Sequence, residues 1–260
     1  MQHLSLFIFI ASSIAGAVYG QNTDYCSADI CRAGITHIAC RHTGQFSSAC
    51  PSSARMVNLD DKLKKAIVNA HNTKRNLIAG GGDERHDPAC RMATMQWDEE
   101  LAKIAAYNVR QCKMAHDKCR NTNKFKYSGQ NLAWMGFMGS TKDVDMLTKA
   151  VNMWYDEVKD SRMEYIDKYP KSYSGPAIGH FTVMVADRNI RVGCAAATYP
   201  EPGQPYNAYL VACNYATTNM MDHPIYASCP KAATGCTTGP NKNFPNLCSP
   251  KEKYDVNKWF

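Results

Sequence analysis

Twelve cysteines constrain the fold of this 260-residue chain more than any other feature, because all of them lie beyond residue 20 and their number is even. An even set of cysteines in an exported chain predicts a framework of disulfide bonds. Their spacings contain no repeated Cys-x-x-Cys pair, so they do not indicate a zinc ribbon. The cysteines are Cys26, Cys31, Cys40, Cys50, Cys90, Cys112, Cys119, Cys194, Cys213, Cys229, Cys236 and Cys248.

The first 20 residues predict the compartment. Leu4 to Val18 is an apolar run without charge, shorter than a comfortable membrane span, and small residues follow where signal peptidase cleaves. We interpret residues 1–20 as a signal peptide and expect a secreted, extracellular chain that starts at Gln21; an N-terminal anchor is the alternative. The chain has no Asn-x-Ser/Thr site, so we do not expect N-glycosylation.

The rest of the chain divides into three parts. Residues 21–56 are rich in Cys, Ser and Gly and predict an irregular N-terminal extension. Residues 57–220 carry the regular patterns of one domain, and residues 221–260 predict an irregular tail that contains cysteines.

Within the central part, helices are expected first and strands last. Apolar residues at helical spacing predict three helices, capped by Asn58, by Asp98, and by Thr141 or Asp143, with the first helix ending at Gly80. Runs rich in Val, Tyr, Phe and Thr then predict three strands. The expected strands are Ile178–Ala186, Arg191–Tyr199 and Tyr206–Tyr215. This order predicts an α+β fold with helices packed on an antiparallel sheet.

Four short motifs in this region resemble the signatures of the CAP superfamily, which comprises the cysteine-rich secretory, antigen-5 and pathogenesis-related 1 proteins. They are His71-Asn72-Thr73-Lys74-Arg75, Gly129-Gln130-Asn131-Leu132, Gly179-His180-Phe181-Thr182 and Leu210-Val211-Ala212-Cys213-Asn214-Tyr215. The four motifs occur in the family's order in a cysteine-rich chain. The chain is therefore similar to the insect antigen-5 proteins of venom and saliva, including those of blood-feeding flies. The chain departs from the family where Gln and Trp are usual, at Val183 and Ala186, and where Pro and Gly are usual, around Ala216 to Thr218.

The resemblance implies an α-β-α sandwich and four disulfides carried over by position. These are Cys26–Cys40, Cys31–Cys119, Cys50–Cys112 and Cys194–Cys213. The other four cysteines are Cys90, Cys229, Cys236 and Cys248, which allow three pairings. The tail has too few cysteines for the ion-channel module of the cysteine-rich secretory members.

The resemblance also implies a cleft tetrad of His116, Gln130, Glu157 and His180. The two imidazoles could bind zinc or another divalent metal, with Glu157 orienting one ring, whereas an amide is a poor metal ligand and cannot act as a general base. The alternative is a cleft held only by hydrogen bonds within the tetrad, and no cofactor is required. Because the chain has no Gly-x-Ser-x-Gly elbow and no paired acid and base, we expect no enzyme; a weak metal-dependent hydrolase is the remaining alternative.

An apolar stretch after the second motif suggests a ligand site. Trp134, Met135, Phe137 and Met138 are expected in a loop, and Met153 and Trp154 follow in the third helix. Aromatic and methionine side chains suit adaptable apolar pockets. The functional interpretation is a channel for a lipid, a role known in parts of the superfamily, and the alternative is ordinary core packing.

The expected function is therefore that of a non-catalytic salivary or venom protein, monomeric, bound by IgE in exposed hosts, and able to take up small hydrophobic mediators. A net charge of +7, with basic clusters such as Lys62, Lys64 and Lys65, leaves open a binding module for a host surface protein or an anionic surface; a plain solvated surface is the alternative. No nucleic-acid partner is expected. The chain has no Arg-Gly-Asp motif, so we expect no integrin antagonism through such a loop.

Overall fold

The computed structural model describes residues 23–258, so the predicted signal peptide lies outside the described residues. The elements in chain order are β1 (Arg55–Met56), α1 (Asp61–Ala79), β2 (Gln96–Trp97), α2 (Glu99–Val109), β3 (Gly129–Phe137), α3 (Asp143–Tyr155), the 3-10 helix η1 (Asp156–Asp160), α4 (Met163–Asp167), α5 (Gly179–Val185), β4 (Arg191–Pro200) and β5 (Asn207–Tyr215). Among residues 23–258, no helix is long and apolar enough to cross a membrane.

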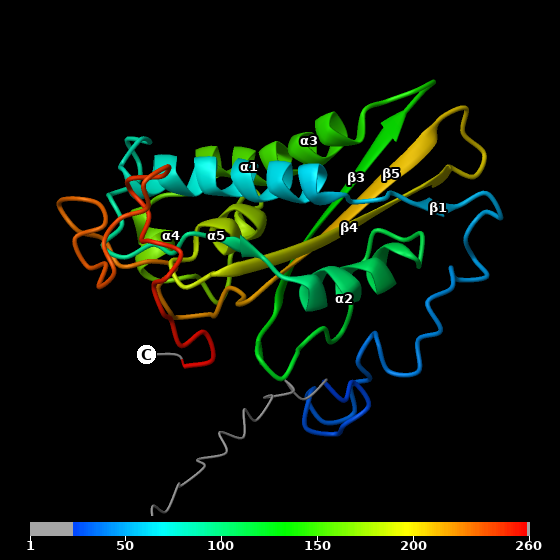
Figure 1. Ribbon diagram of the computed structural model, residues 1–260, viewed down its shortest axis with the longest axis horizontal. Helices are drawn as coiled ribbons and strands as arrows, with labels where there is room; N and C mark the ends of the chain where they lie inside the picture. Colours follow the sequence, from blue (N-terminus) through cyan, green and yellow to red (C-terminus); the bar gives the residue numbers. More distant parts are fainter. Residues whose placement is uncertain (1–22, 259–260) are drawn as a thin grey trace, which may run out of the picture.

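The elements form three layers. The sheet has the order β1-β4-β5-β3 with antiparallel neighbours, and β2 pairs in parallel with β4. Helices α1 and α3 cover one face of the sheet and α2 covers the other (Figure 1). The expected α-β-α sandwich is confirmed by this arrangement.

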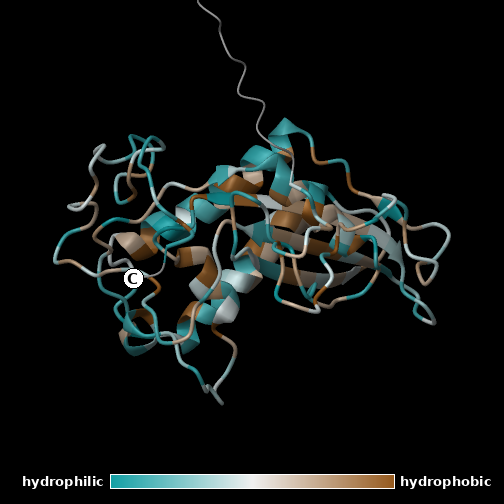
Figure 2. Ribbon diagram, turned by 90° about the horizontal axis from the view of Figure 1, so that it is seen from below, coloured by the Kyte–Doolittle hydropathy of each residue, from teal (hydrophilic) through white to brown (hydrophobic). Residues whose placement is uncertain are grey.

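The central strands β4 and β5 carry apolar residues at successive positions because both of their faces are buried. On β5, Tyr209 and Val211 point into the core under α1 and α3, whereas Ala208 and Leu210 point into the core under α2. In the view coloured by hydropathy, the hydrophobic residues of the helices and strands, drawn in brown, lie toward the interior (Figure 2). This two-sided burial explains why the two last strands were predictable as continuous apolar runs.

Helix starts follow local capping chemistry, with two corrections. Asp98 caps α2 as expected, because its carboxylate accepts hydrogen bonds from the N–H groups of Glu100 and Leu101. The expected cap at Asn58 is wrong, since Asp60 accepts from Leu63 N and α1 begins at Asp61. Helix α3 begins at Asp143, and its N-cap is Lys142 without a side-chain hydrogen bond, so neither Thr141 nor Asp143 caps it.

Two predicted elements are wrong in type. The expected strand Ile178–Ala186 contains helix α5 (Gly179–Val185) instead, and the supposed loop around Trp134 is part of the nine-residue strand β3. Phe181 to Val185 of α5 are five consecutive buried residues, so this run carries no usable period. Distant side chains cap it: Glu157 accepts from two N–H groups at its start, and Arg75 donates to Met184 O and Ala186 O at its end.

Six disulfides hold the irregular parts to the sandwich. Three tie down the N-terminal extension or link it to the loop between α2 and β3, and Cys194–Cys213 joins opposed residues of β4 and β5. These are the four pairs that the resemblance implies. The remaining cysteines pair as Cys90–Cys229, which anchors the tail, and Cys236–Cys248, which closes a loop within it.

Candidate functional site

Three members of the expected tetrad line one pocket of about 260 Å³. His116 comes from the loop after α2, Gln130 from the start of β3, and His180 from the first turn of α5. Glu157 lies behind His180, in η1, and is bonded to it. The pocket also includes Asn219, so the site is formed where four segments of the chain converge.

The first histidine is held by an amide. His116 Nδ1 lies 2.8 Å from Gln130 Oε1. Both amide protons of Gln130 are already used, since Nε2 donates to Asp117 Oδ2 at 2.7 Å and to Asn214 Oδ1 at 2.9 Å. Gln130 Oε1 is therefore an acceptor, His116 carries its proton on Nδ1, and its Nε2 lone pair is free.

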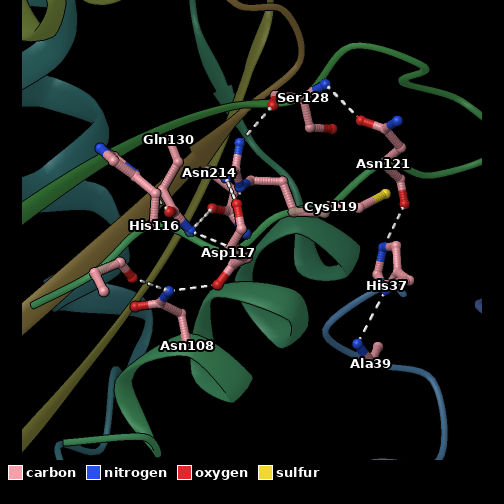
Figure 3. A network of polar contacts seen from close by, with 12 residues as sticks. His37, Ala39, Asn108, His116, Asp117, Cys119, Asn121, Ser128, Gln130 and Asn214 are labelled. Carbon is pink, nitrogen blue, oxygen red and sulfur yellow. Dashed lines mark hydrogen bonds and ion pairs between the residues drawn. The ribbon is translucent and has the colours of Figure 1, made fainter. Parts of the chain in front are cut away.

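Beneath this pair lies a buried polar network that the sequence did not reveal (Figure 3). Asp117, whose side chain is 1% exposed, accepts from Gln130, from Asn108 Nδ2 and from Arg120 Nε at 3.0 Å. A glutamate in place of Gln130 would bring a second carboxylate against Asp117 without a proton to share. The network thus explains why an amide suits this position. The only sequence signal was that Asp117 follows His116 directly.

The second histidine is held by a carboxylate. His180 Nδ1 lies 2.5 Å from Glu157 Oε1, while Oε2 of the same carboxylate accepts from the backbone N–H groups of His180 and Phe181 at 2.8 and 3.0 Å. One carboxylate therefore caps α5 and orients the ring. As with His116, the arrangement leaves the Nε2 lone pair of the ring free.

A third histidine connects the layers below the pocket. His71 is fully buried, its Nδ1–H donates to Ile67 O, and its Nε2 accepts from Tyr215 Oη at 2.9 Å. Tyr215 Oη in turn accepts from Asn131 Nδ2, which also donates to His180 O. Burial lowers the pKa of His71 to about 4, so the ring is neutral at physiological pH.

The pocket can offer a metal two ligands. Burial lowers the pKa of His116, which favours the neutral imidazole that a metal requires, although its hydrogen bond to Gln130 acts in the opposite direction. Within residues 23–258, however, no cluster of three or more His, Cys, Asp or Glu residues has metal-binding geometry. The residues therefore fit a weak site of two imidazoles and do not fit a closed zinc site, which takes four protein ligands.

The two serines considered as nucleophiles, Ser161 and Ser128, are both buried. Ser161 Oγ, His86 and Asp83 form a hydrogen-bonded chain in the order of a hydrolase triad, at 3.2 and 3.1 Å. Ser161 and His86 are only 2% and 3% exposed, so a substrate carbonyl cannot reach them. Ser128 Oγ donates to Phe125 O and is also buried. The described arrangement supports binding better than catalysis.

The six residues expected to line a lipid channel are divided between two hydrophobic clusters and the exposed surface. On β3, Trp134 packs with the core under α2, whereas Met135 points to the opposite face, as alternation in a strand requires. Trp154 is buried and donates from Nε1 to Leu132 O. Met138 and Met153 are exposed, and Phe137 packs beside Tyr209. These residues therefore lie in three separate surroundings, and a lipid channel lined by them stays a prediction.

A different cavity has the expected apolar character. It is a groove of about 820 Å³ between α1, the segment 94–97 that includes β2, and Phe244 of the tail. We call it the α1–β2 groove. Val68, Met95, Trp97 and Phe244 supply its apolar walls, and lysines of the first turns of α1 stand at its rim. The sequence signal was the predicted apolar and basic character of α1, but nothing in the pattern indicated that the tail returns to this helix.

The sandwich, its disulfides and the pocket with two histidines define a class of disulfide-stabilised α+β proteins. Residues 68–215 match the model of CAP, the cysteine-rich secretory protein family. Since that match spans more than half of the chain, the chain belongs to the CAP family, as its four motifs indicated.

Relatives of known sequence lie among insect venom allergens. The chain is 45% identical over 249 residues to venom allergen-1 of Aedes albopictus, covering 95% of this chain and 94% of that protein. It is 42% identical over 252 residues to venom allergen-1 of Aedes aegypti, covering 96% of both. It is 41% identical over 183 residues to the antigen 5 like allergen Cul n 1 of Culicoides nubeculosus, covering 67% of this chain and 83% of that protein.

Solved structures share the fold at lower identity. The crystal structure of NaASP2 with Zn²⁺ superposes with a TM-score of 0.61 at 22% identity, over 77% of this chain and 100% of that one. The structure of BmVAL-1 gives the same TM-score at 21% identity, over 77% and 98%. At these identities the likeness establishes the fold alone.

Proposed function

We propose that this CAP protein is an extracellular, non-catalytic binding protein of the antigen-5 type that takes up small hydrophobic molecules in the α1–β2 groove. The family membership, the predicted signal peptide and the disulfides support the extracellular part of the proposal. The venom-allergen relatives support the antigen-5 type.

The groove is the observation that carries the binding function. Its volume of about 820 Å³ lies within the range of pockets that bury most of a drug-sized ligand. Its walls include two aromatic side chains, Trp97 and Phe244, on separate segments. Aromatic side chains on two walls allow a ligand to be contacted from more than one side.

The experiment is calorimetric titration of the delipidated mature protein with fatty acids, leukotrienes and sterols. Asn69→Trp, on the exposed face of α1 that lines the groove, should obstruct it and weaken binding about tenfold. Asn152→Trp is the matched control, because Asn152 is exposed on α3 outside the groove, and it should leave binding unchanged. Saturable binding that both variants retain would contradict the assignment of the groove as the binding site. Absence of binding across the panel would direct the search to host proteins.

The host side of the proposal concerns recognition of the protein itself. In exposed hosts we expect IgE to bind the protein, as the names of its relatives suggest for them. Binding of serum IgE to the native form, and its loss after reduction and denaturation, would test this. A host surface protein is the alternative partner, and a pull-down at physiological salt would identify one.

Divalent metal binding is a second candidate function. The free Nε2 atoms of His116 and His180 favour it, because each ring is already oriented through Nδ1. When bound, zinc would polarise a ligand oxygen, and this chain would supply the two imidazoles and their oriented rings. Titration with Zn²⁺ should give weak binding that His180→Ala abolishes; binding that survives this change would place the metal elsewhere.

A further inference from the structure

The rim of the α1–β2 groove carries a net positive charge. Three lysines line it, Lys62, Lys64 and Lys65, against two carboxylates, Asp61 and Glu99. The excess is one positive charge beside apolar walls. A neutral hydrophobic ligand would contact the apolar walls but would make no ionic interaction with the charged side chains of the rim.

The three lysines differ in how they are engaged. Lys64 Nζ lies 2.6 Å from Glu99 Oε1 and 5.7 Å from the centre of the Trp97 ring, so its charge is already balanced. Among residues 23–258, no ion pair joins Lys62 or Lys65 to a carboxylate. These two lysines, one turn of α1 apart, are the cations available to a ligand.

The apolar far side of the groove is held in place by the tail. Phe244 lies within the loop closed by Cys236–Cys248. That loop is bonded to both other walls, since Asn246 donates two hydrogen bonds to Asn76 of α1, and Asn241 Nδ2 donates to Thr94 Oγ1. The groove therefore has three walls that are cross-connected, which is a preformed site.

From this arrangement we infer that the α1–β2 groove selects a free long-chain carboxylate, with the carboxylate at Lys62 and Lys65 and the chain against Trp97 and Phe244. The inference rests on the proposed binding function and adds the charge class of the ligand. A single negative charge balances the rim, and an apolar chain matches the walls. A concave, three-walled groove favours a separate molecule over the flat surface of a membrane.

The test compares three probes of equal chain length: oleate, oleyl alcohol and oleylamine, each below its aggregation limit. The protein should bind oleate at least about fivefold more tightly than oleyl alcohol, and oleylamine most weakly. The double variant Lys62→Gln/Lys65→Gln should bring oleate to the affinity of the alcohol, whereas Lys62→Arg/Lys65→Arg should keep the preference. Lys118→Gln/Lys124→Gln, in the loop after α2, is the matched control and should change nothing.

The outcomes separate this inference from the function on which it rests. Equal binding of oleate and oleyl alcohol would overturn the inference and leave the binding function standing, whereas failure of all three probes would overturn both. Sedimentation with vesicles of anionic phospholipid, without binding of monomeric oleate, would also overturn it in favour of a membrane surface. Phe244→Ala should weaken the binding of oleate and of oleyl alcohol by the same factor, because it removes part of the apolar wall and leaves the charge of the rim unchanged. A loss of affinity confined to oleate would contradict the assigned orientation.

Discussion

The two cavities of this protein use their polar groups in opposite ways. In the tetrad pocket most polar side chains are bonded to other parts of the chain, from Gln130 through Asp117 to Asn108, and the two imidazoles are held through Nδ1. In the α1–β2 groove, Lys62 and Lys65 face apolar walls without a carboxylate partner among the described residues. The contrast indicates that the family motifs mainly build the fold, whereas the surface available to a ligand is lined largely by residues outside them.

The largest expected effect lies in the tetrad pocket. Asp117→Ala leaves the protons of Gln130, Asn108 and Arg120 without their buried acceptor. Breaking a buried ionic network in this way typically lowers the free energy of unfolding by about 3–5 kcal/mol. Urea denaturation measures it, with Glu84→Ala, an exposed turn carboxylate, as control. A loss below about 1 kcal/mol would show that the network is dispensable and weaken the contrast.

Acid should also act on the core behind the tetrad. The pKa of His71 is about 4 in the folded protein and near 6.5 when unfolded, so protons bind the unfolded state more readily. The contribution of the neutral His71 ring to the free energy of unfolding is fully present above pH 6.5. It falls by about 3 kcal/mol as the pH is lowered toward 4. Urea titrations between pH 7 and 4 would measure the slope, and His71→Phe should flatten it. An unchanged slope would assign the acid sensitivity to other groups.

A smaller effect is expected at the other end of the tetrad. Glu157→Gln keeps the size of the side chain but removes the charge that caps α5 and pairs with His180. Loss of charge-assisted hydrogen bonds should lower the free energy of unfolding by about 1–2 kcal/mol, with faster amide exchange in α5. Glu164→Gln, an exposed ion-pair partner of Arg162, should change it by less than about 1 kcal/mol. Equal effects of the two changes would refute the capping role.

The smallest effect sharpens the groove side of the comparison. Glu99→Gln releases Lys64 from its ion pair and adds one positive charge at the rim. Because exposed ion pairs contribute little, stability should change by less than about 1 kcal/mol, while oleate affinity should rise about two- to threefold. Calorimetry with oleate and oleyl alcohol measures both affinities. A rise for the alcohol as well would indicate a change of shape rather than of charge.

The sequence was most informative where a pattern is set by neighbouring residues or repeats over a whole helix or strand. The helices around Ile67 and Ile104 and the strands β4 and β5 were predictable because spacing and two-sided burial leave clear periods or continuous runs. Strand β3 and helix α5 were assigned wrongly because their structure depends on distant partners: pairing with β5 for one, and caps from Glu157 and Arg75 for the other.

The sites show the same division. The members of the pairs His116–Gln130 and His180–Glu157 were expected from the family resemblance, which carries residues over by position; only Gln130 and His180 lie within the motifs themselves. The groove depends on contacts across more than 100 residues of chain, such as that of Asn246 with Asn76. Asp117 and Asn108 are close in sequence, but their contact depends on how the loop after α2 folds back onto that helix. No pattern along the chain encodes such a contact.

The tail loop closed by Cys236–Cys248 has a practical consequence for anyone who produces this protein. The loop carries Phe244, one wall of the groove, and only Cys90–Cys229 ties the tail covalently to the sandwich. Material made in a reducing cytosol, or assayed with dithiothreitol in the buffer, would lack both of these bonds, and the wall that Phe244 supplies would lose its covalent anchor. Ligand screens should therefore begin from oxidised protein whose six cystines have been verified by mass spectrometry, since an apparent non-binder could simply be an immature preparation.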